Sequence, residues 1–229
     1  MFRIFDSFEY WFGSVEGLFA FVSFIFAWFF ALSFHEFCHG YVAYKLGDDT
    51  AKAQGRLTLN PFKHLDLWGT IAIIVANVGW ARAVPVNPVR FTRKVTQKTG
   101  MVLVSLAGPL SNFILGFVTL FFYLLTLRLW RINSAPVIVL IQTMLMYLYY
   151  YNILFAVFNL LPIPPLDGYK VFSSFLPNRA YWGLMRYERY GFIILILLFN
   201  IPGIGTILGN AVEGVLAAYT WVFDAIGVI

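Results

Sequence analysis

This sequence of 229 residues has little charge and almost no cysteine. Charged residues make up 12% of the chain and apolar residues 60%, whereas ordinary soluble domains have about 25% and about 45–50%. A water-soluble domain is therefore excluded, and the composition indicates a membrane protein. The single cysteine, Cys38, excludes an intrachain disulfide and a four-cysteine zinc site. Any metal in this chain must be held by histidine and carboxylate side chains.

The basic residues give a net charge of +5, but they lie between apolar runs rather than among aromatic residues on a polar surface. We therefore expect the lipid bilayer, and no nucleic acid, as a partner. Nine of the sixteen Lys and Arg residues fall within residues 45–98, and four more within 165–190. Because cytoplasmic loops are rich in Lys and Arg, both segments are predicted to be cytoplasmic. The N-terminus would then lie outside the cell membrane and the C-terminus inside it.

Long uncharged apolar stretches predict the fold class. A helix needs about 20 residues to cross about 30 Å of hydrocarbon, and five stretches come near to this length. We expect an all-α polytopic membrane protein with about five transmembrane helices, forming a single domain over residues 1–229. The predicted spans are Gly17–Lys45, Thr99–Leu127, Asn133–Leu161, Tyr181–Asn200 and Ile204–Val222.

The segment between the first and second spans predicts two smaller features. Residues 67–81 are apolar, but with 15 residues they are too short to cross the bilayer, so a re-entrant or interfacial hairpin is expected. Ahead of it, residues 55–59 alternate between polar and apolar side chains and end at Asn60-Pro61. That alternation predicts a short edge strand.

The sequence His35-Glu36-Phe37-Cys38-His39 is an HExxH motif within the first predicted span. Lipid leaves no water to satisfy unpaired backbone groups, so this stretch must be helical. Residues i and i+4 share one face of a helix, which lets both imidazoles reach one zinc ion. Glu36 then lies on the flank, where it can take a proton from the attacking water.

Two other interpretations of the motif are weaker. The first is a structural cluster of hydrogen-bonded His and Glu side chains. However, two of the three histidines in the chain fall here, beside an acid whose insertion at membrane depth costs about 2.5–3.5 kcal/mol. The second is a thiol nucleophile at Cys38, but no basic group near it would lower its pKa, and a buried thiol is normally inert. A metal site is therefore favoured.

A catalytic zinc ion normally takes three protein ligands and leaves one position open, so a third ligand is needed. His64 is a candidate by its chemistry, but it lies in the charged loop. Asp167 is the better candidate, because it follows a proline-rich stretch, 162–165, that cannot continue the preceding helix. Gly168 permits a tight turn directly after it. An acid on such a broken helix end can bend back toward the metal.

Three motifs together resemble those of the site-2 protease family of intramembrane zinc metalloproteases. These are HExxH at 35–39, AGPxxN at 107–112 and NxxPxPPLDG at 159–168. The loop strings GRLTLNPFKHLD (55–66) and GWARAVPVNP (79–88) also resemble the compact prokaryotic members that lack PDZ and CBS domains. The resemblance implies a catalytic core over about residues 17–175, with additional spans over about 181–226.

Carried over residue by residue, the resemblance implies one zinc ion per chain, held by His35, His39 and Asp167, with Glu36 as general base and acid. Asn112 and Asn159 would line the site and hold the scissile carbonyl or the oxyanion, although each Asn could equally make an interhelical hydrogen bond. The implied substrate is a transmembrane protein, cut near the cytoplasmic side. No regulator is predicted. The alternative is a zinc-binding membrane scaffold or transporter that does not hydrolyse peptides.

Overall fold

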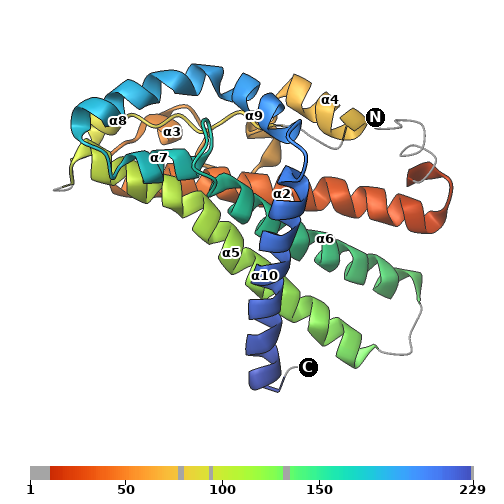
Figure 1. Cartoon of the computed structure of the whole chain (residues 1–229). Coiled ribbons are helices and arrows are strands. Elements are labelled where there is room, and N and C mark those ends of the chain that lie inside the picture. Colours follow the sequence, from red (N-terminus) through yellow and green to blue (C-terminus); the bar gives the residue numbers. More distant parts are fainter. Residues whose placement is uncertain (1–10, 77–79, 93–94, 131–134, 228–229) are drawn as a thin grey trace.

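Three long apolar helices form the centre of the molecule. A computed structural model describes residues 11–76, 80–92, 95–130 and 135–227. Helices α2 (Val15–Lys45), α5 (Gln97–Leu129) and α6 (Pro136–Asn159) each pack against the other two (Figure 1). Each is long and apolar enough to cross a membrane, which confirms the first three predicted spans as helices.

Local signals fix where these helices begin. The Ser14 side chain accepts a hydrogen bond from the backbone N–H of Gly17 at 3.0 Å and caps α2, while Thr96 caps α5 in the same way. Within the bundle, Phe24 and Trp28 of α2 are almost fully buried and pack against aromatic side chains of α6. These contacts hold α2 and α6 together along the N-terminal half of α2.

The fourth predicted span, Tyr181–Asn200, is not one helix. It is divided among α8 (Asn178–Met185), the 3₁₀ helix η3 (Arg186–Tyr190) and α9 (Gly191–Phe199). With 9 residues, α9 is only about 13 Å long, too short to cross the bilayer alone. The charged residues of η3 interrupt the apolar run, and sequence-based counting of apolar residues did not register this break.

Helix α10 (Ile204–Ala225) follows α9 after a sharp bend. The two helices meet at 87°, with Gly203 at φ +91° in the turn, a conformation that favours glycine. Helix α10 then crosses α5 and α6 at a steep angle (Figure 1). The described residues therefore hold three helices able to span a membrane, or four if the bent pair is one span, and the count of five is not confirmed.

Between α2 and α5, the described residues form short elements: α3 (Thr50–Ala53), η1 (Pro61–Lys63), α4 (Leu67–Ala76) and η2 (Pro88–Arg90). The strand predicted at 55–59 is not present. Those residues form a turn and bends, because no neighbouring backbone pairs with them as a ladder. Instead Thr58 turns its carbonyl toward the ring of His64, with the Thr58 O to His64 Nε2 distance at 2.8 Å.

Within the apolar stretch 67–81, the described residues form helix α4 and an isolated bridge at Ala81, and a re-entrant course in the membrane stays a prediction. An antiparallel bridge joins Leu65 to Ala81, and the N–H of Arg82 donates to the carbonyl of His64 at 2.9 Å. Both ends of the stretch therefore lie side by side, as a hairpin course requires. Residues 77–79, which were part of that prediction, lie outside the described residues.

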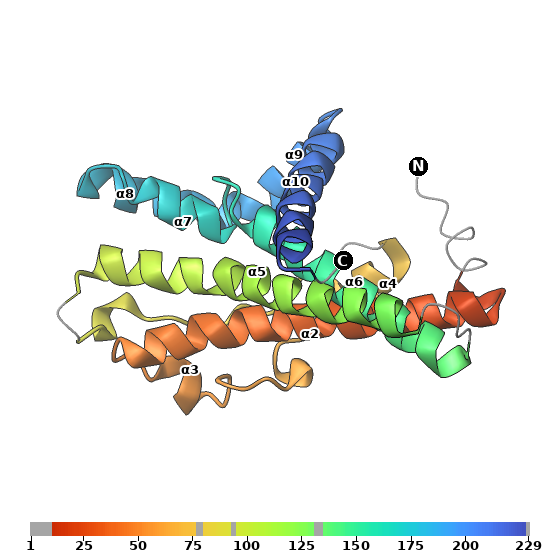
Figure 2. The same ribbon diagram turned by 90° about the horizontal axis from the view of Figure 1, so that it is seen from below.

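Helix α7 (Asp167–Ser173) packs against α5. Figure 2 shows α7 and α8 lying along the first half of α5. The phenol of Tyr169 in α7 donates a hydrogen bond to the carbonyl of Leu184 in α8 at 2.8 Å, which ties the two short helices together. Asp167 at the start of α7 contacts His35 and His39, and the rest of this layer faces the HExxH motif across a cavity.

Candidate metal centre

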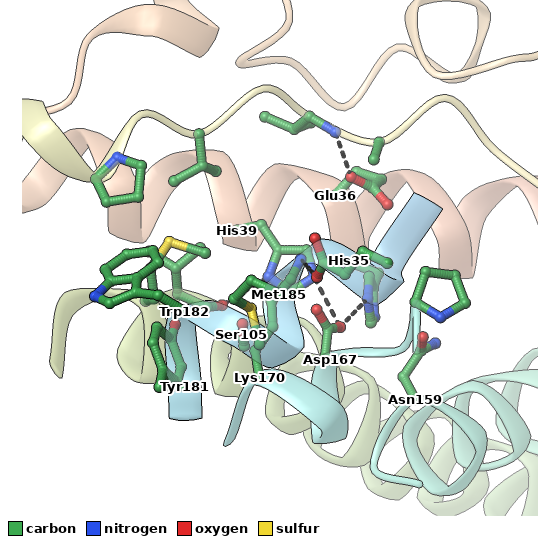
Figure 3. A pocket seen from close by; sticks show the side chains of 18 residues that line it. His35, Glu36, His39, Ser105, Asn159, Asp167, Lys170, Tyr181, Trp182 and Met185 are labelled. Atoms are coloured by element: carbon green, nitrogen blue, oxygen red, sulfur yellow. Dashed lines mark hydrogen bonds and ion pairs between the residues drawn. The ribbon is translucent and has the colours of Figure 1, made fainter. Parts of the chain in front are cut away.

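His35, His39 and Asp167 come together in the structure. The Nε2 atoms of His35 and of His39 each lie 3.0 Å from the same carboxylate oxygen, Oδ2 of Asp167. The two imidazoles stand nearly perpendicular, at 88°. Figure 3 shows the three side chains pointing toward one another, two from α2 and one from the first residue of α7. Residues 132 positions apart in the sequence thus form one cluster of possible metal ligands.

The proline-rich segment and Gly168 bring Asp167 to this position. Helix α6 ends at Asn159, and a series of turns separates it from α7. A Cβ atom at Gly168 would lie 2.2 Å from the carbonyl oxygen of Leu160, so only glycine lets α7 start against the end of α6. The chain can therefore reverse at once and direct Asp167 back toward α2.

Hydrogen bonds fix which ring nitrogens face the cluster. Nδ1 of His35 lies 2.6 Å from Oδ1 of Asn112, and Nδ1 of His39 lies 2.6 Å from the carbonyl oxygen of Val104. A carbonyl oxygen can only accept, so both Nδ1 atoms carry the hydrogen and donate it. This arrangement is typical of histidines that bind a metal through the other nitrogen.

The remaining lone pairs fit a cation such as zinc. Both Nδ1 hydrogens are used away from the cluster, so the Nε2 atoms of neutral imidazoles would offer lone pairs to a bound cation, beside the carboxylate oxygen of Asp167 at 3.0 Å. Although burial acts against its ionisation, the neighbouring imidazoles of His39 and His35 hold the pKa of Asp167 below its ordinary value. Two histidines and a carboxylate are a ligand set that catalytic zinc uses.

Gly108 keeps space open in front of these atoms. A Cβ atom there would lie 2.5 Å from Nε2 of His39 and 2.6 Å from Nε2 of His35. Helix α5 therefore approaches the metal-facing nitrogens with bare backbone. A side chain larger than glycine would occupy the space beside both Nε2 atoms, and an ion bound to both histidines needs that space.

Glu36 stands on the wall of a cavity of about 390 Å³ that includes the three clustered residues. Its side chain is 8% exposed, and Oε2 accepts a hydrogen bond from the backbone N–H of Val84 at 2.8 Å (Figure 3). Residues 81–87 run past this point without helix or sheet partners of their own, apart from the bridge at Ala81. The sequence string 79–88 contributed to the family resemblance, but the hydrogen bond from the N–H of Val84 to Glu36 could not be predicted from it.

The two predicted asparagines lie in different places. Asn159 lines the cavity, and its amide donates to the carbonyl of Phe155 at 3.0 Å. Asn112 is fully buried behind His35, where its Nδ2 donates to the carbonyl of Ala31 and to Oδ1 of Asn152. The expected substrate contact of Asn112 therefore does not fit its position, because its amide is already occupied in orienting His35.

Asn152, His64 and Cys38 lie outside the cluster of possible metal ligands. Asn152, a polar residue in the apolar α6, was missed by sequence reasoning, although its type and depth were a signal. His64 is buried away from the cluster and contacts Thr58, so it is not among the grouped ligands. Cys38 lies on α2 within the motif but outside that group.

Comparison with known proteins identifies the family of this chain. The family model described as peptidase family M50 matches residues 126–199. A protein of Bacillus subtilis, YwhC, is 45% identical over 172 residues, which cover 75% of this chain and 77% of the relative. This chain belongs to peptidase family M50, the site-2 protease family.

Further M50 relatives cover more of the chain. Rip2 of Mycolicibacterium smegmatis is 31% identical over 213 residues, covering 91% of this chain and 75% of the relative. Rip2 of Mycobacterium tuberculosis is 29% identical over 210 residues, with the same shares. YwhC and Rip2 both carry the name "Putative zinc metalloprotease". No solved structure matches the chain significantly. The M50 membership makes this membrane protein a zinc metallopeptidase.

Proposed function

We propose that this M50 protein is an intramembrane protease that binds one zinc ion through His35, His39 and Asp167 and cuts transmembrane proteins. The observation that carries the proposal is the convergence of three acceptor atoms, with both histidine Nδ1 hydrogens used elsewhere. The cluster lies at the end of a helix long and apolar enough to span a membrane. A metal centre at that place serves substrates that are themselves in the bilayer.

Glu36 supplies the acid–base chemistry in this proposal. Zinc bound by the cluster would act as a Lewis acid and lower the pKa of a coordinated water to about 7. Glu36 accepts a proton from the attacking water and returns it to the leaving amine. The N–H of Val84 holds one carboxylate oxygen in place and leaves the other oxygen for this transfer. Asn159, on the cavity wall, is placed to contact the scissile carbonyl.

The extended segment 82–87 is the proposed docking strand for an unwound substrate. Its residues Ala83, Val84 and Val86 line the cavity, while Arg56 binds the carbonyls of Arg82 and Ala83 from the opposite side. A substrate helix hides its peptide carbonyls in its own hydrogen bonds, so it must unwind before cleavage. The backbone carbonyls of Val84 and Val86, which accept no hydrogen bond from a described residue, can then bind it by strand addition.

The charge distribution supports a cytoplasmic location for the active site. The cavity is framed by residues 83–88 and 165–188, which belong to the two basic segments of the sequence. Basic segments near membrane spans favour the cytoplasmic side. We therefore place the catalytic cavity nearer the cytoplasmic face of the cell membrane.

Replacing Glu36 by Gln in the purified full-length protein tests the mechanism. Zinc content should stay at one ion per chain, whereas cleavage of a transmembrane substrate should fall by about 10²-fold or more, because the general base is lost. Glu213→Gln, on the exposed surface of α10, is the matched control and should cleave normally. Unchanged cleavage by Glu36→Gln would contradict the mechanism and favour a non-proteolytic zinc scaffold or transporter. Full zinc content in Asp167→Ala would remove Asp167 as third ligand.

A further inference from the structure

A second hollow lies on α8 and η3, with a lining different from that of the catalytic cavity. It has a volume of about 790 Å³, and its polar lining consists of Arg186, Arg189, Tyr187 and Tyr190. A Cβ atom at Gly183 would meet nothing within 4 Å, so no described atom fills the hollow at this position. None of these residues has a part in the proposed proteolytic mechanism.

The 3₁₀ geometry of η3 groups these side chains by type. A 3₁₀ helix has three residues per turn, so residues i and i+3 stand above one another. Arg186 and Arg189 therefore share one edge, and Tyr187 and Tyr190 share the next, with ring centroids 6.5 Å apart. On the third edge, Glu188 pairs with Lys170 at 3.4 Å and lines the catalytic cavity.

The two arginines carry charge that the described part of the chain does not neutralise. Arg189 lies over the ring of Tyr190 at 4.8 Å, and neither Arg186 nor Arg189 forms an ion pair with a described residue. Other cations are paired, as Arg90 is with Asp49. Two guanidinium groups beside tyrosine hydroxyls form a site suited to phosphate, which Arg binds in bidentate fashion.

The surroundings of the hollow favour a phosphate that carries acyl chains. Helix α9 begins directly after Tyr190, and its aliphatic side chains Ile193 and Leu197 are 58% and 63% exposed. Trp182 and Tyr187 are also exposed, as aromatic residues at a membrane interface commonly are. A ligand that places a phosphate at η3 and hydrocarbon along α9 has the chemistry of a phospholipid.

We propose that the hollow binds the headgroup of an anionic phospholipid, with Arg186 and Arg189 on the phosphate and α9 against an acyl chain. Anionic lipids are concentrated in the cytoplasmic leaflet, the side on which the basic residues place this segment. The proposal goes beyond the proteolytic function and does not depend on it. It adds a lipid site on the segment whose other edge faces the catalytic cavity.

Lipid binding to the full-length protein in detergent tests this proposal. Native mass spectrometry would compare retention of phosphatidylglycerol and phosphatidylcholine by the wild type, by Arg186→Gln/Arg189→Gln, and by Lys63→Gln/Arg179→Gln. The second pair removes the same charge at exposed positions that do not line the hollow. We expect the first pair to weaken phosphatidylglycerol binding about tenfold or more, and the control pair to leave it within about twofold of the wild type.

Zinc content and circular dichroism of both variants show whether they are folded, and glycerol phosphate and inorganic phosphate serve as competitors. Neither should displace phosphatidylglycerol at millimolar concentration if the acyl chain contributes to binding. Equal loss in both double variants would overturn the proposal, because it would show general charge attraction. Displacement by inorganic phosphate alone would also overturn it, because the hollow would then bind a soluble anion.

Discussion

The orientation of His35 depends on a hydrogen bond from its far side. Asn112 accepts from Nδ1 of His35 at 2.6 Å and is itself held by Asn152 and by the carbonyl of Ala31. Three groups, one each from α2, α5 and α6, thereby fix one imidazole ring. We therefore propose that Asn112 positions His35 as a zinc ligand, in line with the interhelical hydrogen bond that the sequence left open as the alternative to a substrate contact.

Replacing Asn112 by Leu should weaken zinc binding by about 10- to 100-fold, the usual cost of losing such a partner of a metal-binding histidine. The measurement is competition for zinc with a chelator of known affinity. Asn200→Leu is the matched control, because Asn200 is exposed and bonds only within α9. If the variant at Asn112 holds zinc as tightly as the wild type, the positioning role is wrong.

At this scale the sequence predicted which residues meet but not how they are held. The spacing of His35 and His39 follows from helix periodicity, and the proline-rich stretch indicated that Asp167 could turn back. In contrast, the bond from Val84 to Glu36 joins a backbone group 48 positions away, and the open space at Gly108 depends on how closely α5 approaches α2. Both depend on tertiary packing, which local sequence patterns do not encode.

At the scale of elements, the extended segment between α2 and α5 is 82–87 and not the predicted strand 55–59. Alternating side chains at 55–59 predicted a strand, but that stretch is bent and lies around His64. The segment with Pro85 in it, which strand propensity disfavours, is the extended one beside Glu36. Proline is tolerated at position 85 because no strand among the described residues pairs with this segment.

Replacing Val84 by Pro tests the role of that segment. The substitution removes the N–H that holds Glu36, so cleavage should fall by about tenfold or more while zinc stays bound. Val84→Ala keeps the N–H and loses most of the side chain, and it should retain more activity than the proline variant. Equal activity of the two variants would show that the backbone bond does not matter.

At the scale of the whole molecule, the length of apolar runs predicted three helices correctly and the C-terminal region less well. Residues 181–200 are apolar enough on average, but charged residues in η3 and the bend before α10 divide the run. Average hydropathy does not register where a helix breaks. The polytopic all-α class therefore follows from the sequence, whereas the number of spans does not.

The predicted orientation can be tested by cysteine labelling in a Cys38→Ser background. The single cysteines replace Lys63, in the segment between α2 and α5, and Trp130, directly after α5, and both residues are exposed. A membrane-impermeant thiol reagent should label position 63 only from the cytoplasmic face and position 130 only from outside. Labelling of both positions from one side, or the reverse pattern, would contradict the proposed topology.

The separation of the histidines from Asp167 along the chain also determines how long after them Asp167 is synthesised. Asp167 follows His35 by 132 residues, so at about 5–20 residues per second it leaves the ribosome roughly 7–26 s after His35. During that interval the nascent chain has both imidazoles but lacks the carboxylate that completes the cluster. Helices α2, α5 and α6 are therefore synthesised before the cluster of His35, His39 and Asp167 can form.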